Sequence, residues 1–439
     1  MTGPIARSSP PLRRELGLVE VTLSGVGIIL GAGIYVLIGE GARLSGNALW
    51  AAFVISAAIA FFTCMSYAEL SSMFPKAGAE YDYVGSAFSQ RLAFVIGLLV
   101  FLSGILAATT VALGFAGYVS ALMALPVQVS ALGILLILTV VLLYGVKETA
   151  RVAVVATLIE VSGLVLIIAL GIPHLGDVNY LEMPLGFSGL LAASALIFFA
   201  YQGFESMVKF SEEARNPEKT VPRALILALT ISTAIYILVA LSAVSLIGWQ
   251  DLGASDAPFS EIVGNALGPD AAILISGIAL FATGNTVLLS LYASTRILYG
   301  MAGSPSMPGA VALVLPGRRT PWVAILVTTA LAVVFIFSGD IAFVANVTNF
   351  TLYVSFIAIN ATVIVLRFRS PGLKRPFRIP FSPGGVPLIP VAGLVMSVFL
   401  LSRQDLPVLL LGAALALVCI GLSFVRIPGD PGNGNKNEG

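Results

Sequence analysis

The chain has 439 residues, of which 58% are hydrophobic and only 10% are charged, and its formal net charge is +1. Soluble globular domains carry about 25% charged residues, so this composition excludes a water-soluble protein and indicates an integral membrane protein. The near-zero net charge gives no reason to expect a nucleic-acid partner. Two cysteines inside apolar runs and one histidine in a predicted loop offer no basis for a disulfide framework, a metal site or a cofactor.

Apolar runs along the chain predict the membrane spans. A bilayer core of about 30 Å needs roughly 20 apolar residues per helix. The sequence therefore predicts twelve spans, at about residues 18–38, 47–73, 92–121, 128–145, 151–172, 188–210, 222–247, 270–299, 321–337, 341–366, 386–402 and 406–425. Residues 1–16 carry no signal-peptide cleavage pattern and are predicted to be a cytosolic tail. The polar, glycine-rich segment 427–439 is predicted to be a disordered cytosolic tail.

The placement of the basic residues predicts the orientation. With the N-terminus in the cytosol, the inner loops receive clusters such as "KFSEEARNPEKTVPR" and "RFRSPGLKRPFR". Of the 23 basic residues, only Arg43 and Arg403 fall on the outer side. This asymmetry follows the positive-inside rule, and it would be lost if the predicted topology had missed or added a span. The sequence therefore predicts a multi-pass protein of the cell membrane with both termini in the cytoplasm.

The first predicted span contains "GIILGAGIYVLIG", which places four glycines in residues 27–39. Glycine in a helix interior costs about 1 kcal/mol relative to alanine, so the stretch predicts a weak point in the helix. A dinucleotide-binding loop is excluded, because the spacing fails and the segment is intramembrane. Gly27 and Gly31 also form a G-x-x-x-G pair, which commonly marks close helix packing. The stretch alone leaves both interpretations open.

The sixth span favours the broken-helix interpretation. It reads "ALIFFAYQGFESMVKF", with Gly203 as an interruption and the carboxylate of Glu205 two residues later. A carboxylate within a span is a functional candidate, because it is costly unless it faces a cavity or a partner. The first ten spans divide into two halves of five. Because each half has an odd number of spans, the second half crosses the membrane in the opposite orientation to the first. Interrupted helices at corresponding positions of inverted repeats predict the binding site of a transporter.

The chemistry of a broken helix predicts the ligand. Where a helix breaks, backbone groups lose their partners, which is tolerated only where they line a cavity. Exposed N–H groups at Gly31, Ala32 and Gly33 would bind a carboxylate at the start of the outer half-helix. Carbonyl groups at Phe199, Ala200 and Tyr201 would accept hydrogen bonds from an ammonium group. Together these groups predict a site for an α-amino acid.

Several motifs resemble the amino acid–polyamine–organocation transporters, especially the branch similar to cationic amino acid transporters. They are "GAGIYVLIG", "SYAELSSMFPKAGAEYDYV", "FFAYQGFES…EEARNPEKTVPRA", "STRILYGMA" and "TLYVSFIAINATVIVLRFR…RPFRIPF". The resemblance implies an all-α, leucine-transporter-type fold of twelve transmembrane helices, in which a 5+5 inverted repeat with broken helices 1 and 6 is followed by two extra helices. It implies spans 1–5 in residues 17–173, spans 6–10 in 174–369 and spans 11–12 in 370–426.

The resemblance also implies roles for individual residues. Spans 1 and 6 would hold the substrate and spans 3 and 8 would complete the pocket. Ala32 and Gly33 would bind the carboxylate, the carbonyls at Phe199, Ala200 and Tyr201 would bind the amine, and Phe204 would be a gate or side-chain contact. Ile29 and Gly203 complete the predicted substrate-binding set. Gln202 departs from the family, since an aliphatic residue is usual there.

Glu160 is the leading candidate for coupling to an ion. Proton-coupled relatives often carry a lysine at this position, nine residues after Arg151. Glu160 would lie about 14 Å from the cytosolic end of its span, at 1.5 Å per residue, where desolvation favours the protonated carboxyl. It is interpreted as a proton carrier, with a structural acid or an attractor of cations as alternatives. Glu205, Thr286 and Ser290 are further coupling candidates, Glu205 being equally compatible with a helix cap.

Other function classes fit the sequence less well. A membrane enzyme would need a metal cluster or a nucleophile–base pair at membrane depth, and a channel usually shows a continuous polar stripe. We therefore predict a secondary active amino acid transporter that works by alternating access, with proton symport as the coupling. An amino acid exchanger, a sodium-coupled carrier and a non-transporting amino acid sensor remain alternatives. Aromatic residues near the breaks favour neutral substrates and the intramembrane acids favour cationic ones, and the sequence predicts no oligomeric state.

Overall fold

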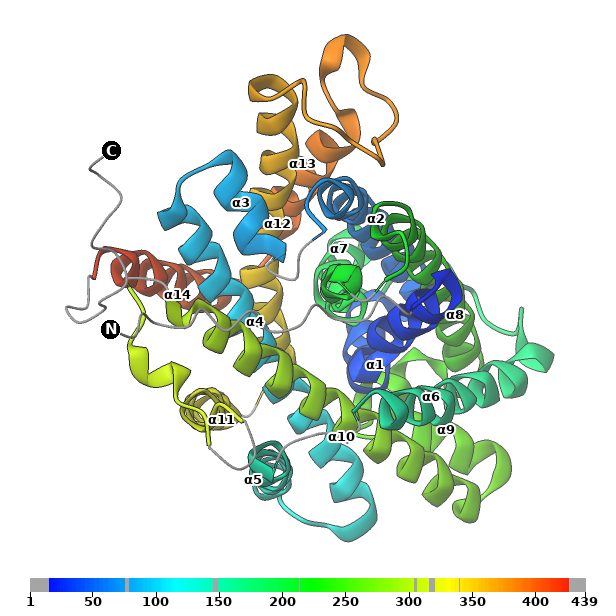
Figure 1. Ribbon diagram of the computed structural model, residues 1–439. Helices are drawn as coiled ribbons and strands as arrows, with labels where there is room; N and C mark the ends of the chain where they lie inside the picture. The colour runs from blue at the N-terminus through cyan, green and yellow to red at the C-terminus, as the bar shows by residue number, and fades with distance from the viewer. Residues whose placement is uncertain are drawn as a thin grey trace, which may run out of the picture.

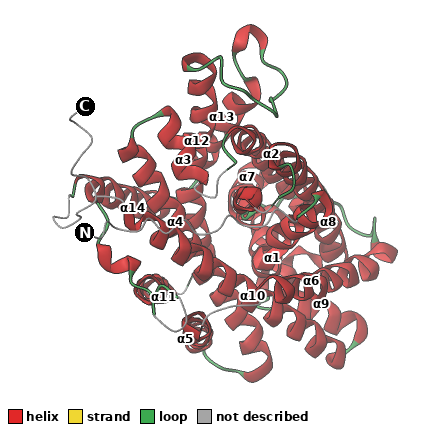
Figure 2. Cartoon of the chain, in the orientation of Figure 1, coloured by secondary structure: helices red, strands yellow, loops and turns green. Residues whose placement is uncertain are grey.

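The computed structural model describes residues 16–75, 79–144, 149–212, 214–303, 306–315, 320–338 and 340–425. The predicted tail 1–16, apart from its last residue, and the predicted tail 427–439 lie outside this range. Within the described residues the chain forms helices and loops, and no β-strand (Figure 2). One isolated bridge pairs Leu16 with Ala214. The fold is therefore all-α, as the sequence predicts.

Fourteen α-helices make up most of the described chain (Figure 1). They are α1 (Leu18–Ser45), α2 (Leu49–Met73), α3 (Ala79–Ala87), α4 (Gln90–Met123), α5 (Val127–Tyr144), α6 (Thr149–Gly171), α7 (Gly186–Ile197), α8 (Pro217–Ala254), α9 (Pro258–Leu267), α10 (Pro269–Gly300), α11 (Trp322–Ile336), α12 (Ile341–Arg369), α13 (Leu388–Ser402) and α14 (Leu406–Phe424). Short 3₁₀ helices join them: η1 (Gly46–Ala48), η2 (Ile172–His174), η3 (Phe198–Tyr201), η4 (Phe204–Glu212), η5 (Met301–Gly303), η6 (Gly309–Ala312) and η7 (Pro383–Gly385).

Most of these helices coincide with the apolar runs of the sequence. By length and composition, nine helical stretches of the described chain are suited to cross a membrane, and the first of them contains both α1 and α2. Helices α11 and α13 are apolar but shorter. Helices α3 and α9 lie in segments that the apolar pattern assigns to loops. The composition and the helix lengths together indicate that the chain is a multi-pass membrane protein.

The helices that carry the two glycine-rich stretches lie at the centre of the fold. In Figure 1, α7 is seen end-on with α1, α2 and α8 around it, and the three helices α1, α2 and α8 pack together. Helix α4 packs on α10 and α12 and forms the neighbouring group. Helix α1 contacts both α10 and α4, so the first glycine-rich stretch lies where the two groups meet.

Tyrosine hydroxyls in the core satisfy backbone groups of neighbouring helices. Tyr35, Tyr118, Tyr201, Tyr236 and Tyr353 are buried, and each donates a hydrogen bond to a backbone carbonyl of another helix. A buried carbonyl without a partner is costly in an apolar interior. The tyrosines therefore join neighbouring helices, and Tyr236 and Tyr353 bond to carbonyls close to the interruptions described below.

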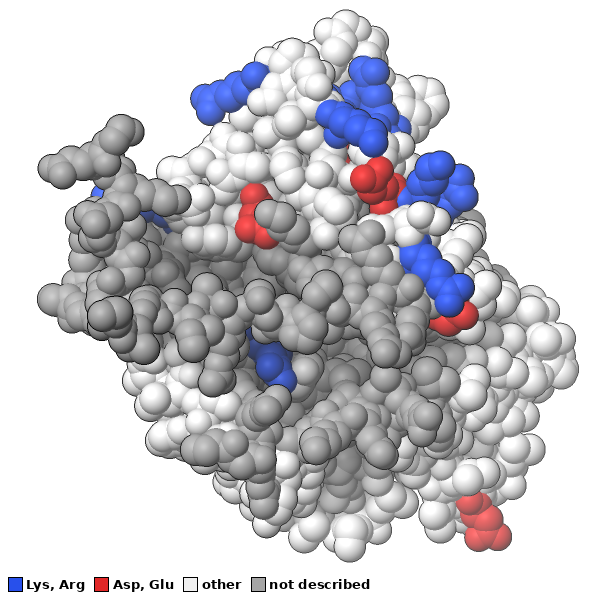
Figure 3. All heavy atoms as spheres, viewed as in Figure 1, with Lys and Arg blue, Asp and Glu red and all other residues white. Residues whose placement is uncertain are grey.

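A buried ion pair joins the ends of α2 and α12. The Glu69 carboxylate is 1% exposed and accepts hydrogen bonds from Nε and Nη2 of Arg367, at 2.9 and 2.5 Å. Nε of Arg375 lies 3.3 Å from Oε1, and the Ile379 N–H donates to Oε2 at 2.9 Å. The buried ion pair therefore anchors the segment after α12 to the end of α2. Other basic side chains are exposed, and they gather on the face of the molecule drawn in Figure 3.

Candidate functional site

Helix α1 is interrupted at Gly31. Its φ of −6° and ψ of −169° are not helical, so the backbone turns within an otherwise continuous helix. Two residues later, Gly33 faces the other interrupted segment at very short range. A Cβ atom at Gly33 would lie 2.7 Å from the Cα atom of Ala200, so only glycine fits there without displacing backbone. The glycines thus allow both a break and a close approach.

The second interruption follows α7. The chain continues through η3, extends at Gln202 with a ψ of 143°, and passes through Gly203 at a φ of 115° before η4 begins. A positive φ of this size is readily adopted only by glycine. Oε2 of Glu205 accepts a hydrogen bond from the Gly203 N–H at 2.8 Å. Glu205 therefore caps the segment after the break, one of the two roles that the sequence left open.

One tyrosine ties the two breaks together. Tyr236, on α8, donates to the carbonyl of Ile29 at 2.5 Å and to the carbonyl of Ala200 at 2.8 Å. The sequence analysis did not identify Tyr236. Its signal is a lone tyrosine in the aliphatic run "STAIYILVA", because a buried hydroxyl in an apolar span needs a partner.

Helix α12 supplies further partners to the end of α7. Nδ2 of Asn349 donates to the carbonyls of Ala195 and Leu196, at 2.7 and 3.1 Å. The Tyr353 hydroxyl also donates to the Ala195 carbonyl, at 2.9 Å. These contacts hold the end of α7 in place just before the second break.

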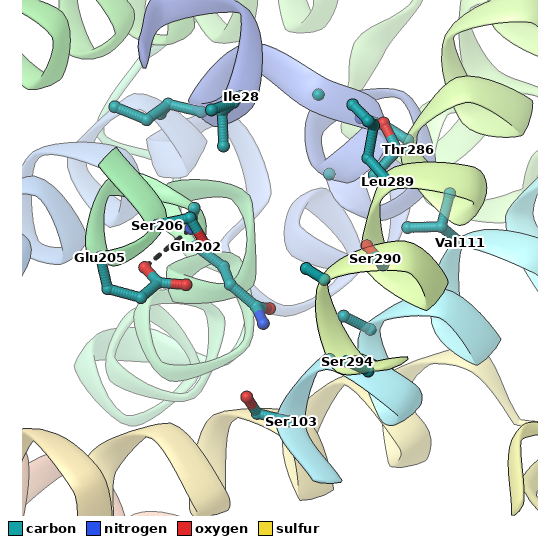
Figure 4. A pocket seen from close by; sticks show the side chains of 18 of the residues that line it. Ile28, Ser103, Val111, Gln202, Glu205, Ser206, Thr286, Leu289, Ser290 and Ser294 are labelled. Atoms are coloured by element: carbon teal, nitrogen blue, oxygen red, sulfur yellow. Dashed lines mark hydrogen bonds between the residues drawn. The ribbon is translucent and has the colours of Figure 1, made fainter. Parts of the chain in front are cut away.

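A cavity of about 340 Å³ lies beside the breaks. This is within the size range of small-molecule sites. Its described lining comes from α1, α4, the segment from η3 to η4, and α10 (Figure 4). Helices α4 and α10 correspond to the third and eighth predicted spans. The described lining contains nine side chains with polar groups: Ser103, Gln202, Glu205, Ser206, Asn285, Thr286, Ser290, Tyr292 and Ser294.

Most of the predicted substrate-binding residues lie on this cavity. The lining includes Ile29, Gly31, Ala32, Gly33, Phe199, Ala200 and Gly203. Tyr201 and Phe204 are buried elsewhere and are not part of it. The Tyr201 hydroxyl donates to the carbonyl of Phe53 on α2, and the Phe204 ring packs against Tyr67 and Phe356. The structure therefore places Phe204 in an aromatic cluster, where the sequence predicted a gate or substrate contact.

Several of the predicted backbone groups already have partners. The Ala32 N–H donates to Oγ1 of Thr286 at 3.1 Å, so this donor is bonded within the protein. The Ala200 carbonyl accepts from Tyr236, and the Phe199 carbonyl accepts from the Gln202 N–H at 3.1 Å. A carbonyl oxygen has two lone pairs and can accept a second hydrogen bond. The break therefore presents fewer unoccupied groups than the sequence predicted.

Glu160 lies behind the breaks and is not part of the cavity lining. Its side chain is 1% exposed, and within the described structure its Oε1 atom has no hydrogen-bond partner. Its backbone carbonyl accepts from the Tyr35 hydroxyl at 2.6 Å, and its carboxyl is close enough to interact electrostatically with Tyr35 and Tyr236. Glu160 thus lies near the Tyr236 hydroxyl that holds the two breaks, while Glu205, Thr286 and Ser290 line the cavity itself.

Comparisons with known proteins agree on one family. The sequence model described as "Amino acid permease" matches residues 20–418. The chain is 31% identical over 412 residues to the branched-chain amino acid permease BcaP of Bacillus subtilis, which covers 89% of this chain and 88% of that protein. It is 32% identical over 409 residues to the methylthioribose transporter of the same species, covering 87% of each. It is 30% identical over 386 residues to the vacuolar cationic amino acid transporter 4 of Arabidopsis thaliana, covering 82% of this chain and 64% of that protein.

Proposed function

The chain belongs to the amino acid permease family, and from this premise we propose that it is a secondary active transporter that moves amino acids across the cell membrane by alternating access. Members of this family are transporters and not enzymes. One observation carries the proposal: two interrupted helices meet beside a cavity, and both present backbone groups to it. An amino acid has one carboxylate and one ammonium group, which match the two kinds of backbone group at the breaks.

The twelve-span, leucine-transporter-type 5+5 arrangement is part of this proposal. Counting α1 and α2 separately and adding α11 and α13 brings the spans to the predicted twelve. Contacts between loops support the alternation of sides. Asn47 and Trp249 both donate hydrogen bonds to Glu182, and all three residues belong to segments predicted on the outer side of the membrane. Ser72 bonds to the backbone of Phe377, and both of these residues belong to segments predicted on the inner side. The predicted repeats 17–173 and 174–369, spans 11–12 in 370–426 and the cytosolic termini belong to the same topology.

We place the substrate with its carboxylate at the start of the outer half of α1. Gly31 and Gly33 line the cavity there, and the Thr286 hydroxyl adds a side-chain group at the same point. Anions bind well at such helix starts because of the aligned peptide dipoles. The ammonium group would use the remaining lone pairs of the carbonyls of Phe199 and Ala200.

The structure supports an inward-facing state in this proposal. From the breaks the lining continues to Val100, Phe210 and Ile297. All three lie in the predicted cytosolic halves of their helices. Alternating access requires a second state, in which this side closes and the outer side opens around the same breaks.

We propose Glu160 as the proton-binding group of the transport cycle. An ionised carboxylate with an unpartnered oxygen is unstable in an apolar interior, so this environment favours the protonated form. Its electrostatic interaction with Tyr236 links its charge to the hydroxyl group that positions the two breaks, and its backbone carbonyl accepts a hydrogen bond from Tyr35. Exchange, sodium coupling and a sensor without transport are the alternatives.

The experiment is uptake of a labelled amino acid panel into sodium-free proteoliposomes, with and without an inside-alkaline pH gradient. We expect accumulation only with the gradient. Uptake that ignores the gradient would contradict proton symport and leave exchange or, if added sodium drives it, sodium coupling. Binding without uptake of any amino acid would indicate a sensor, and absence of both would overturn the proposal.

A further inference from the structure

The cavity contains more polar groups than the α-carboxylate and α-ammonium groups of a substrate require. Beyond the breaks, the side chains of Ser103, Gln202, Glu205, Ser290 and Ser294 border the same space. We call these five residues the polar wall. Figure 4 shows Gln202 extending from the second break into the cavity, between Glu205 and the side that carries Ser290 and Ser294. The wall is therefore in position to contact a substrate side chain.

Two atoms of the polar wall have no hydrogen-bond partner within the described structure. Oε1 of Gln202 and Oγ of Ser294 are both shielded from solvent and unpaired. The Ser103 hydroxyl, by contrast, donates to the Val100 carbonyl at 2.8 Å, and Glu205 is held by the Gly203 N–H. Buried polar atoms in native proteins nearly always have a partner. The missing partner at Gln202, which extends into the cavity, indicates a polar ligand group beside its amide, whereas Oγ of Ser294 packs against Gly104 of α4.

The charge of the lining restricts which group this is. Among the described lining residues, Glu205 is the one acidic or basic side chain. No lysine, arginine or histidine of the described lining would offset a second carboxylate. Bringing a second carboxylate next to this buried acidic side chain, with no basic group beside it, is unfavourable. An acidic substrate side chain is therefore disfavoured at the polar wall.

We propose that Gln202 selects the substrate by its side chain, so that the polar wall accepts amino acids with hydrogen-bonding amide or hydroxyl side chains over aliphatic or acidic ones of equal size. This inference rests on the proposed function, since it assumes that the α-groups sit at the breaks. The backbone N–H of Gln202 is bonded to the Phe199 carbonyl, so the break itself directs this side chain. An aliphatic side chain would cover the Gln202 amide without giving it a partner, and such mismatches are strongly rejected.

Asparagine, leucine and aspartate test the proposal, because the three side chains have nearly the same shape. Uptake and binding of each would be measured on the full-length protein in proteoliposomes and in detergent. The variants are Gln202→Leu and, as a matched control, Gln404→Leu. Gln404 also has a shielded amide atom without a partner within the described structure, but it lies between α13 and α14, away from the cavity.

We expect the wild-type protein to prefer asparagine over leucine by roughly tenfold or more and to reject aspartate. Gln202→Leu should reduce or reverse the asparagine-to-leucine ratio, whereas Gln404→Leu should leave it unchanged. Wild-type preference for leucine or aspartate, or an equal ratio in Gln202→Leu and wild type, would overturn the proposal. The wild-type ratio decides even if the variant does not fold.

Failure of the proposed function gives a different result. If binding shows the asparagine preference but no amino acid is transported, selection by Gln202 stands and transport is refuted. If no amino acid is bound or transported, both proposals are overturned. If amino acids are transported without preference for asparagine, transport stands and the role of Gln202 is refuted.

Discussion

Replacement of Tyr236 by phenylalanine tests whether one hydroxyl holds the two breaks in register. Phenylalanine retains the ring contacts with Phe53 and Tyr201, whose ring centroids lie 5.3 and 5.2 Å away, so the change is confined to the hydroxyl group. That hydroxyl shares a single proton between the carbonyls of Ile29 and Ala200. Because one proton can fully satisfy only one of the two carbonyls, its loss should cost as much as one unsatisfied buried group. We therefore expect the free energy of unfolding to fall by about 1–3 kcal/mol.

A matched variant separates this effect from the general cost of removing a buried hydroxyl. Tyr353→Phe removes a hydroxyl that donates to the Ala195 carbonyl, but this carbonyl keeps its hydrogen bond from Asn349. We expect the loss to be smaller, about 0.5–1 kcal/mol, because no carbonyl is left unpaired. Denaturant unfolding of the purified protein in detergent gives both values.

The same pair of variants tests the functional part of the reasoning. A shift in the relative position of the breaks that costs about 1.4 kcal/mol at the transport barrier slows uptake tenfold. We expect Tyr236→Phe to lose about this much uptake at equal protein content, and Tyr353→Phe to lose less. Equal losses in both variants, for stability and for uptake, would refute the view that Tyr236 has a special position at the breaks.

Three further predictions follow from single contacts. Gly33→Ala should fold, but its uptake rate should fall at least about tenfold, because the new Cβ would lie 2.7 Å from the backbone of the opposite break. The control Gly277→Ala should transport normally, because a Cβ at that position meets no atom within 4 Å. Glu69→Gln should lower the free energy of unfolding by about 3–5 kcal/mol, since it leaves buried arginines without a counter-charge. The control Glu218→Gln removes an exposed ion pair and should lower the free energy of unfolding by less than about 1 kcal/mol. Glu160→Gln should retain substrate binding but lose the dependence of uptake on the pH gradient, and an unchanged dependence would refute the proton-carrier role.

The two breaks illustrate how function depends on local sequence and on distant partners together. The glycines at residues 31, 33 and 203 allow the irregular backbone and its close contact, and no other residue type fits these positions as well. Glycine alone, however, does not give the freed carbonyls a partner. Those partners come from α8 and α12, far along the chain from α1 and α7.

The sequence by itself determined the helices and the position of the breaks. Membrane spans follow from local hydrophobicity, because every backbone group in lipid must bond within its own segment. Accordingly the predicted apolar runs coincide with α1, α2, α4 to α8 and α10 to α14. Glycine also acts locally, but the first stretch alone was equally compatible with close helix packing, and the interruption at Gly31 was predicted only together with the one at Gly203.

Only the tertiary structure decided which groups at the breaks remain available to a ligand. Tyr236 reaches Ile29 across 207 positions of sequence, and Thr286 reaches the Ala32 N–H across 254. The aromatic cluster that takes Phe204 away from the cavity also forms from separate helices. Such contacts depend on how helices pack and rotate against each other, and no local pattern encodes that. Hydrophobicity therefore fixes where the chain crosses the membrane, while packing determines what the site can bind.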